Sequence, residues 1–190
     1  MGISIYLFLI GRIWAEGPLL REERMLHCMS ELYKNKVLIT GGVTGTGSYI
    51  KSTYILDLMT GTFSDVGDLS RNRRMPDCIL FKNRLYLVEE RKRHYSETEM
   101  FDPDRKTWTK GPSFPRQIDG RPTLAKIQNQ LFCSDFIHLY KLFHHESNTK
   151  WELITPVKGQ KSSENFIPLA VVILEVNPIK DNICNFFMNK

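Results

Sequence analysis

The sequence has few of the residue patterns that mark a metal centre or an enzyme active site. Its four cysteines (Cys28, Cys78, Cys133 and Cys184) lie about fifty residues apart, which excludes the close pairs of zinc ribbons and thioredoxin-like motifs. It contains neither an HExxH motif nor a GxSxG nucleophile elbow. We therefore expect no catalytic residue, no metal and no cofactor, and four lone thiols of the kind found in a reducing compartment.

Two further stretches have only a superficial likeness to ligand sites. The glycine-rich segment 41–51 (GGVTGTGSYIK) lacks the Gly-Lys-Ser/Thr of a P-loop, and the run that follows it alternates like a strand instead of opening a helix. We interpret the segment as a flexible loop. His138, His144 and His145 have no carboxylate or cysteine at a ligand spacing, so we expect them in a partly solvated turn.

Long hydrophobic runs are also absent. The opening MGISIYLFLIG holds about ten apolar residues, too few to span a bilayer, and it has no basic region before it. A buried strand is expected there, and a cleaved signal is the alternative. The chain is predicted to contact no membrane and to be cytoplasmic or nuclear.

What the sequence does contain is a repeat. The stretch LYKNKVLITGG from Leu32 aligns with LFKNRLYLVEE from Leu80 and, more loosely, with KIQNQLFCSDF from Lys126. Each copy carries an asparagine between two apolar runs, where asparagine tolerates the left-handed backbone of a two-residue hairpin turn. Three hairpins with similar spacing are predicted, at Asn35, Asn83 and Asn129.

A second pattern follows each hairpin and ends in an aromatic residue. Asp57 and Asp102 stand six residues before Phe63 and Trp108, and each opens a turn between two strand-like runs. In the third copy His145 stands six residues before Trp151, so that copy has diverged. Two hairpins in each unit predict an antiparallel four-stranded sheet. Such sheets must stack face to face to bury both surfaces, and stacking around an axis gives a propeller.

In their order and period these residues resemble the kelch repeat. The resemblance covers roughly Trp14 to Pro156 and implies an all-β, kelch-type β-propeller with about three blades and incomplete ends. It rests on the repeat positions Gly41, Gly42, Tyr54, Asp57, Phe63, Asp102, Trp108 and Trp151. The glycine pair is predicted to be a structural joint, because glycine permits close approach and unusual dihedrals. Glu89-Glu90 and Ser134-Asp135 replace it in the other units.

The period divides the chain into five parts. Propellers normally close with four to eight blades, so three blades are expected to need further blades, from a longer chain or from another chain. The predicted parts are the last strand of a preceding blade (1–20), three repeats (21–70, 71–115 and the divergent 116–156) and an incomplete fourth blade or tail (157–190).

Basic clusters lie in the predicted connections between and within blades. In a four-stranded antiparallel unit the connections from strand two to three and from strand four to the next blade emerge on one side. That face is predicted to form a basic collar for an acidic protein segment, because arginine binds carboxylates bidentately; a solvated rim without a partner is the alternative. The candidate residues are Arg71, Arg73, Arg74, Arg91, Lys92, Arg93, Arg116 and Arg121.

The function expected from the resemblance is noncatalytic protein binding. Kelch propellers commonly serve as substrate-recognition parts of ubiquitin ligases or as cytoskeletal binders. The alternative is a propeller enzyme whose active site lies on blades absent from this sequence. Nucleic acid is not an expected partner, because the aromatic residues lie in predicted strands and not among the basic loops.

Overall fold

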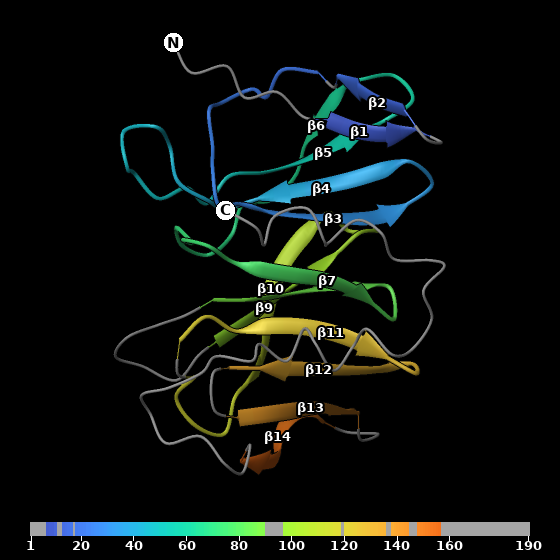
Figure 1. The fold of residues 1–190 in the computed structure, drawn as a ribbon. Coiled ribbons are helices and arrows are strands. Elements are labelled where there is room, and N and C mark those ends of the chain that lie inside the picture. The colour runs from blue at the N-terminus through green and yellow to red at the C-terminus, as the bar shows by residue number, and fades with distance from the viewer. Residues whose placement is uncertain are drawn as a thin grey trace. The chain divides into compact units, whose positions relative to one another are not determined.

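The chain folds into β-strands and turns only, in the part that its computed structural model describes (Figure 1). The described residues are 7–10, 13–16, 18–89, 97–118, 120–135, 138–144 and 148–156. Within them, no helix is present that could cross a membrane. The strands are β1 (Leu7–Ile10), β2 (Ile13–Glu16), β3 (Cys28–Tyr33), β4 (Lys36–Thr40), β5 (Thr53–Asp57), β6 (Phe63–Asp65), β7 (Asp77–Phe81), β8 (Arg84–Val88), β9 (Glu97–Asp102), β10 (Thr107–Ser113), β11 (Thr123–Ile127), β12 (Gln130–Ser134), β13 (His138–His144) and β14 (Thr149–Pro156).

Twelve of these strands form three antiparallel four-stranded sheets, which confirms the predicted all-β class. We call them blade 1 (β3–β6), blade 2 (β7–β10) and blade 3 (β11–β14), and in each blade the strands pair in chain order. The first strand of blade 2, β7, contacts the first strands of both other blades, β3 and β11. The predicted repeat units are therefore successive sheets that stack side by side.

The hairpin turn that opens each blade has the conformation predicted from its asparagine. Both central residues have positive φ in every case, as a type I′ turn requires. Such a turn matches the right-handed twist of the strands that it joins. The three pairs are Lys34-Asn35 (33° and 63°), Lys82-Asn83 (48° and 58°) and Gln128-Asn129 (45° and 60°).

The aspartate turns of blades 1 and 2 are also confirmed. The Oδ1 of Asp57 accepts the backbone N–H of Met59 at 2.8 Å, and the Oδ1 of Asp102 accepts that of Asp104 at 2.9 Å. Hydrogen bonds to the charged form lower the pKa of both carboxyl groups. The largest cause is the hydrogen bond from the Lys36 side chain at Asp57, and the hydrogen bond from the backbone N–H of Arg105 at Asp102.

In blade 3 the position of the turn aspartate differs from the prediction. Leu56, Phe101 and Leu142 pair with the aromatic residues of their blades, so Phe143, and not His145, follows at the position of Asp57. The turn before Trp151 is longer than its counterparts, which is why counting back from the tryptophan misplaced the residue. His145 itself lies outside the described residues.

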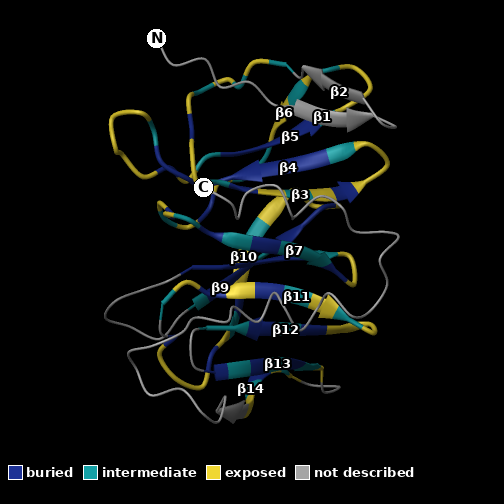
Figure 2. Ribbon diagram, in the orientation of Figure 1, coloured by how far each residue is buried: buried dark blue, intermediate teal, exposed yellow. Residues whose placement is uncertain are grey.

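Alternating side chains of blade 2 fill the cores on its two sides. Leu85 and Leu87 pack with Leu38 and Ile55 of blade 1, whereas Tyr86 and Val88 pack with residues of blade 3. Figure 2 shows burial most clearly along β4, in which every residue after Lys36 is buried. This double-sided core is what stacking of repeats predicts.

The aromatic anchors close these cores from the last strand of each blade. Trp108 packs on the core between blades 1 and 2, and its Nε1 donates to the Oγ1 of Thr53 at 3.2 Å. Trp151 is buried and stacks on Phe114 with ring centroids 4.7 Å apart. The shared aromatic position therefore serves packing between repeats.

The first predicted part differs in strand number. Residues 7–16 form a two-stranded antiparallel sheet, β1 and β2, where a single strand was expected. The predicted fourth blade or tail, 157–190, lies outside the described residues.

Candidate functional site: the loop face

Hydrogen bonds join two of the loops that are predicted to share one face, those between β4 and β5 and between β6 and β7. We call this side of the blades, with the described parts of the β4–β5, β6–β7 and β10–β11 connections, the loop face. The backbone N–H of Gly42 in the β4–β5 loop donates to the carbonyl of Arg73 in the β6–β7 loop at 2.9 Å. Loops of neighbouring blades are thus part of one hydrogen-bonded framework.

The glycine pair of blade 1 is a structural joint, as predicted. Gly41 and Gly42 have φ of 64° and 102°, in the region that side chains disfavour. A Cβ on Gly42 would lie 2.6 Å from the carbonyl oxygen of Met25 and 2.9 Å from the Cβ of His27. The backbone of the preceding loop therefore occupies the space that a side chain would need.

Replacing Gly42 by alanine is expected to lower the free energy of unfolding by about 2 to 3 kcal/mol, through left-handed strain and steric overlap. Urea unfolding followed by circular dichroism measures the change. Gly47→Ala is the matched control, because Gly47 also has positive φ (85°) but nothing lies within 4 Å of an added Cβ. Equal losses in both variants would show that close approach contributes nothing.

Arg73 corrects the prediction of an exposed basic collar. Its side chain is completely buried. Its Nε donates to Glu99 at 3.0 Å and its Nη1 to Glu89 at 3.1 Å, while Nη2 also pairs with Glu99. A buried arginine between two carboxylates holds the loop in place and cannot receive a partner's acidic segment.

The same two carboxylates organise the rest of this arginine-rich loop. Glu89 also accepts the backbone N–H of Arg74 at 2.7 Å and pairs with Arg71 at 2.9 Å. Glu99 accepts the backbone N–H of Ser70 at 2.9 Å. Glu89, which replaces a glycine of the pair in blade 2, is thus a structural acid that neutralises the loop's own arginines.

Arginines at related places anchor the loops of the other blades. Arg24 is buried, donates to the carbonyl of Gly41 at 3.1 Å and lies 4.6 Å above the ring of Tyr54. In blade 3 the Nη1 of Arg116 lies 3.0 Å from the Nε2 of His138. Each arginine reaches the start of the third strand of its own blade.

The strand register places equivalent residues of blades 1 and 2 beside Arg24 and Arg73. Ile39, Leu87 and Cys133 each stand four residues after the turn asparagine, and their partners on the third strands are equivalent positions. Those partners are Tyr54, Glu99 and Tyr140. The partner position therefore presents an aromatic ring to Arg24 and a carboxylate to Arg73.

The histidines singled out as metal candidates contact other groups. The Nδ1 of His138 lies 3.1 Å from the Oδ2 of Asp135, while His144 stacks on Phe81 at 5.9 Å and lies 3.2 Å from the Oγ1 of Thr149. Among the residues that the structure describes, no three metal-ligating side chains gather.

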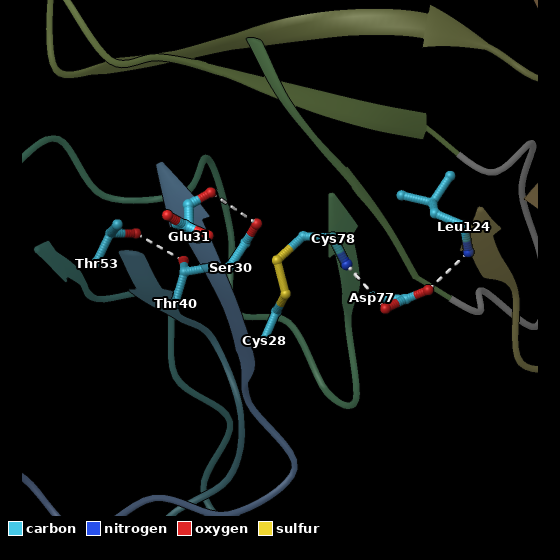
Figure 3. The surroundings of a disulfide bond; sticks show 8 residues. All are labelled: Cys28, Ser30, Glu31, Thr40, Thr53, Asp77, Cys78 and Leu124. Atoms are coloured by element: carbon cyan, nitrogen blue, oxygen red, sulfur yellow. Dashed lines mark hydrogen bonds between the residues drawn. A yellow bond between two sulfur atoms is a disulfide. The ribbon is translucent and has the colours of Figure 1, made fainter. Parts of the chain in front are cut away.

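The expectation of four lone thiols is wrong for two of them. Cys28 of β3 and Cys78 of β7 form a disulfide with a Cα–Cα distance of 6.0 Å (Figure 3). Their separation in sequence is one repeat, so equivalent edges of neighbouring blades bring them together. The argument from lone thiols to a reducing compartment no longer holds, and a cytoplasmic location stays a prediction.

The residue before Cys78 continues this connection to blade 3. Asp77 accepts the backbone N–H of Leu124 at 2.6 Å and that of Cys78 at 3.0 Å (Figure 3). Burial raises the pKa of the Asp77 carboxyl, although these hydrogen bonds oppose the shift. The disulfide and Asp77 thus link the first strands of all three blades.

Four of the predicted collar residues have side chains that reach solvent. Arg74, Arg116 and Arg121 are exposed, and Arg71 is partly exposed. The side chain of Arg74 has no hydrogen-bond or ion-pair partner among the described residues. Arg91, Lys92 and Arg93 lie outside the described residues.

Sequence reasoning missed three exposed apolar residues in the loops that backbone bridges join to the segment of Arg74. Met25, Leu26 and Tyr49 are 50%, 44% and 49% exposed. Antiparallel bridges join Met25 to Val43 and Val43 to Tyr49, and another joins Ile50 to Arg73. The last bridge places Tyr49 and Arg74 at flanking positions of two adjacent segments. Tyr49 lies in a glycine-rich segment, which invites comparison with phosphate-binding loops, and nothing in that pattern indicates an exposed tyrosine.

A cleft of about 340 Å³ lies beside the last two strands of blade 2. Glu97, Glu99, Trp108 and Lys110 contribute to its wall. Lys110 lies 3.3 Å from Glu97 across this wall, and Glu99 pairs with Arg73.

Comparison with known proteins supports the fold class. No family model and no curated protein matches the chain. Among solved structures it is similar to YjhT, with a TM-score of 0.66 and 10% sequence identity, over 83% of this chain and 60% of the YjhT chain. At this identity the likeness concerns the fold alone. The chain is an all-β protein built from propeller-like blades.

Proposed function

We propose that the chain is a kelch-type, noncatalytic protein-binding module that uses its loop face. The kelch assignment is supported by the roles of the repeat residues: Gly41-Gly42 permits the close approach of two loops, Asp57 caps a turn, and Trp108 packs between blades. Buried ion pairs and backbone bridges hold the loops in one arrangement, which limits the entropy lost on binding.

The observation that carries this proposal is the exposed group Met25, Leu26, Tyr49 and Arg74, which we call the contact patch. Tyrosine, methionine and arginine are enriched in protein interfaces, and tyrosine and arginine dominate binding hot spots. The patch lies on a bridged backbone and offers an arginine free of ion pairs within the described residues. A partner segment with an apolar side chain next to a carboxylate fits this chemistry.

The double variant Tyr49→Ala/Arg74→Ala is expected to reduce partner recovery at least about tenfold, because hot-spot truncations each cost more than about 1 kcal/mol. Crosslinking of tagged chain in a native extract, followed by quantitative mass spectrometry, measures recovery.

Met59→Ala/Arg105→Ala is the matched control, since these side chains are 76% and 83% exposed in turns at the other end of the blades. It is expected to recover the same proteins as the wild type. A protein lost only from the contact-patch variant supports the proposal. Equal recovery by both variants contradicts it.

A further inference from the structure

A buried polar cluster in blade 3 fixes the protonation state of one histidine. The Nη1 of Arg116 lies 3.0 Å from the Nε2 of His138, and a guanidinium only donates hydrogen bonds. The Nε2 must therefore accept, which leaves the proton on Nδ1, where it faces the carboxylate of Asp135 at 3.1 Å. His138 is thus neutral in this arrangement, with Arg116 and Asp135 as the opposite charges beside it.

We propose that His138 is a pH-sensitive clamp that holds the β10–β11 loop through Arg116 when neutral and releases it when protonated. A proton on Nε2 would replace the acceptor with a donor that points at the guanidinium. The imidazolium would then form an ion pair with Asp135, which already faces its Nδ1. Arg116 is exposed and can move into solvent, so the exchange needs no opening of the core.

Among the groups of this cluster, His138 is the one suited to gain a proton at mildly acidic pH. Tyr140 donates to Asp135 at 3.3 Å, and burial, followed by the nearby Asp135 charge, raises the pKa of the Tyr140 hydroxyl. Burial also raises the pKa of the Cys133 thiol, which pairs across the strands with Tyr140. Both stay protonated at neutral and mildly acidic pH, whereas histidine is the side chain whose charge normally changes there.

Release of Arg116 would affect the packing of blade 3 through Phe114. Phe114, two residues before Arg116, stacks on Trp151 at 4.7 Å and lies edge-on to Tyr140 at 5.0 Å. The clamp therefore holds a loop whose other anchor is the aromatic core. Loss of the polar anchor alone predicts local loosening of residues 114–118, with blade 3 still folded.

Nuclear magnetic resonance on the whole chain tests the clamp without any partner, and so independently of the proposed binding function. At about pH 8, imidazole ¹⁵N shifts should show His138 with its proton on Nδ1. On titration to about pH 5.5, the amide signals of Phe114 and residues 116–118 should shift with the same midpoint as the His138 ring. A proton on Nε2, or a charged ring at the higher pH, would overturn the proposal.

Two variants separate the clamp from a general response to acid. In Arg116→Ala the ring should still titrate, but the amide transition at 114–118 should be lost; Arg121→Ala, another exposed arginine next to blade 3, should retain it. His138→Asn can keep a donor towards Asp135 but cannot reach Arg116, and should abolish the transition. A transition that persists in Arg116→Ala would overturn the clamp even if His138→Asn fails to fold.

Discussion

Replacing Arg73 by alanine is expected to lower the free energy of unfolding by about 3 to 5 kcal/mol, since truncating one member of a buried ion pair leaves charge uncompensated. Arg73 is the only positive side chain within the described residues that pairs with both Glu89 and Glu99, which are themselves buried. Its removal would leave Glu99 without a cation among the described residues, leave Glu89 paired with Arg71 alone, and release the β6–β7 loop. Urea unfolding monitored by circular dichroism gives the difference.

The adjacent arginine supplies the control for this experiment. Arg74 is exposed, and its contact with Glu89 uses its backbone N–H, which any residue except proline retains. Arg74→Ala is therefore expected to change stability by no more than about 0.5 kcal/mol. If Arg73→Ala were as mild as Arg74→Ala, the buried ion-pair cluster would not anchor the loop.

Removing the disulfide is expected to lower the free energy of unfolding by about 4 kcal/mol, the loop-closure value for a crosslink across about fifty residues. Cys28 and Cys78 are 50 residues apart and join the first strands of blades 1 and 2. The double variant Cys28→Ser/Cys78→Ser, unfolded in urea beside the oxidised wild type, measures this loss.

Reductant supplies the internal control. It should destabilise the wild type to about the level of the double variant and should leave the double variant unchanged. Alkylation of Cys28 and Cys78 in the native wild type without reductant, located by peptide mass spectrometry, would contradict the crosslink. The same stability with and without reductant would also contradict it.

Local sequence signals predicted the strands and turns because their causes are local. Asn35 and its equivalents need left-handed backbone, and Asp57 binds N–H groups two and three residues away. Each requirement is met within a few residues, so the pattern is visible in the sequence. The period then predicted that the units are sheets stacked on one another.

The outcome for the arginines depended on contacts that the repeat alone does not reveal. Arg73 is buried because two glutamates of its own blade replace the glycine and the tyrosine found beside Arg24, and this requires the register of strands β8 and β9. A comparison of the charges at equivalent positions of the repeats could have indicated that Arg73 pairs with glutamates. Glu89 and Glu99 occur in the second repeat, whose loop has the most arginines.

The crosslink was missed for a related reason. Zinc ribbons and thioredoxin-like motifs have both cysteines on one short segment, whereas Cys28 and Cys78 lie on neighbouring blades. A separation close to one repeat places two residues at adjacent edges of a stack. The distance between cysteines in the sequence therefore has to be compared with the repeat length.

We propose that neighbouring arginines of the loop face have different tasks: Arg73 stabilises the fold and Arg74 contacts a partner. The most direct test measures both urea unfolding and crosslinked partner recovery for Arg74→Ala, beside Arg73→Ala. For Arg74→Ala we expect wild-type stability and reduced recovery of the partner. For Arg73→Ala we expect a large loss of stability. Full partner recovery by Arg74→Ala, or a stability loss equal to that of Arg73→Ala, would contradict it.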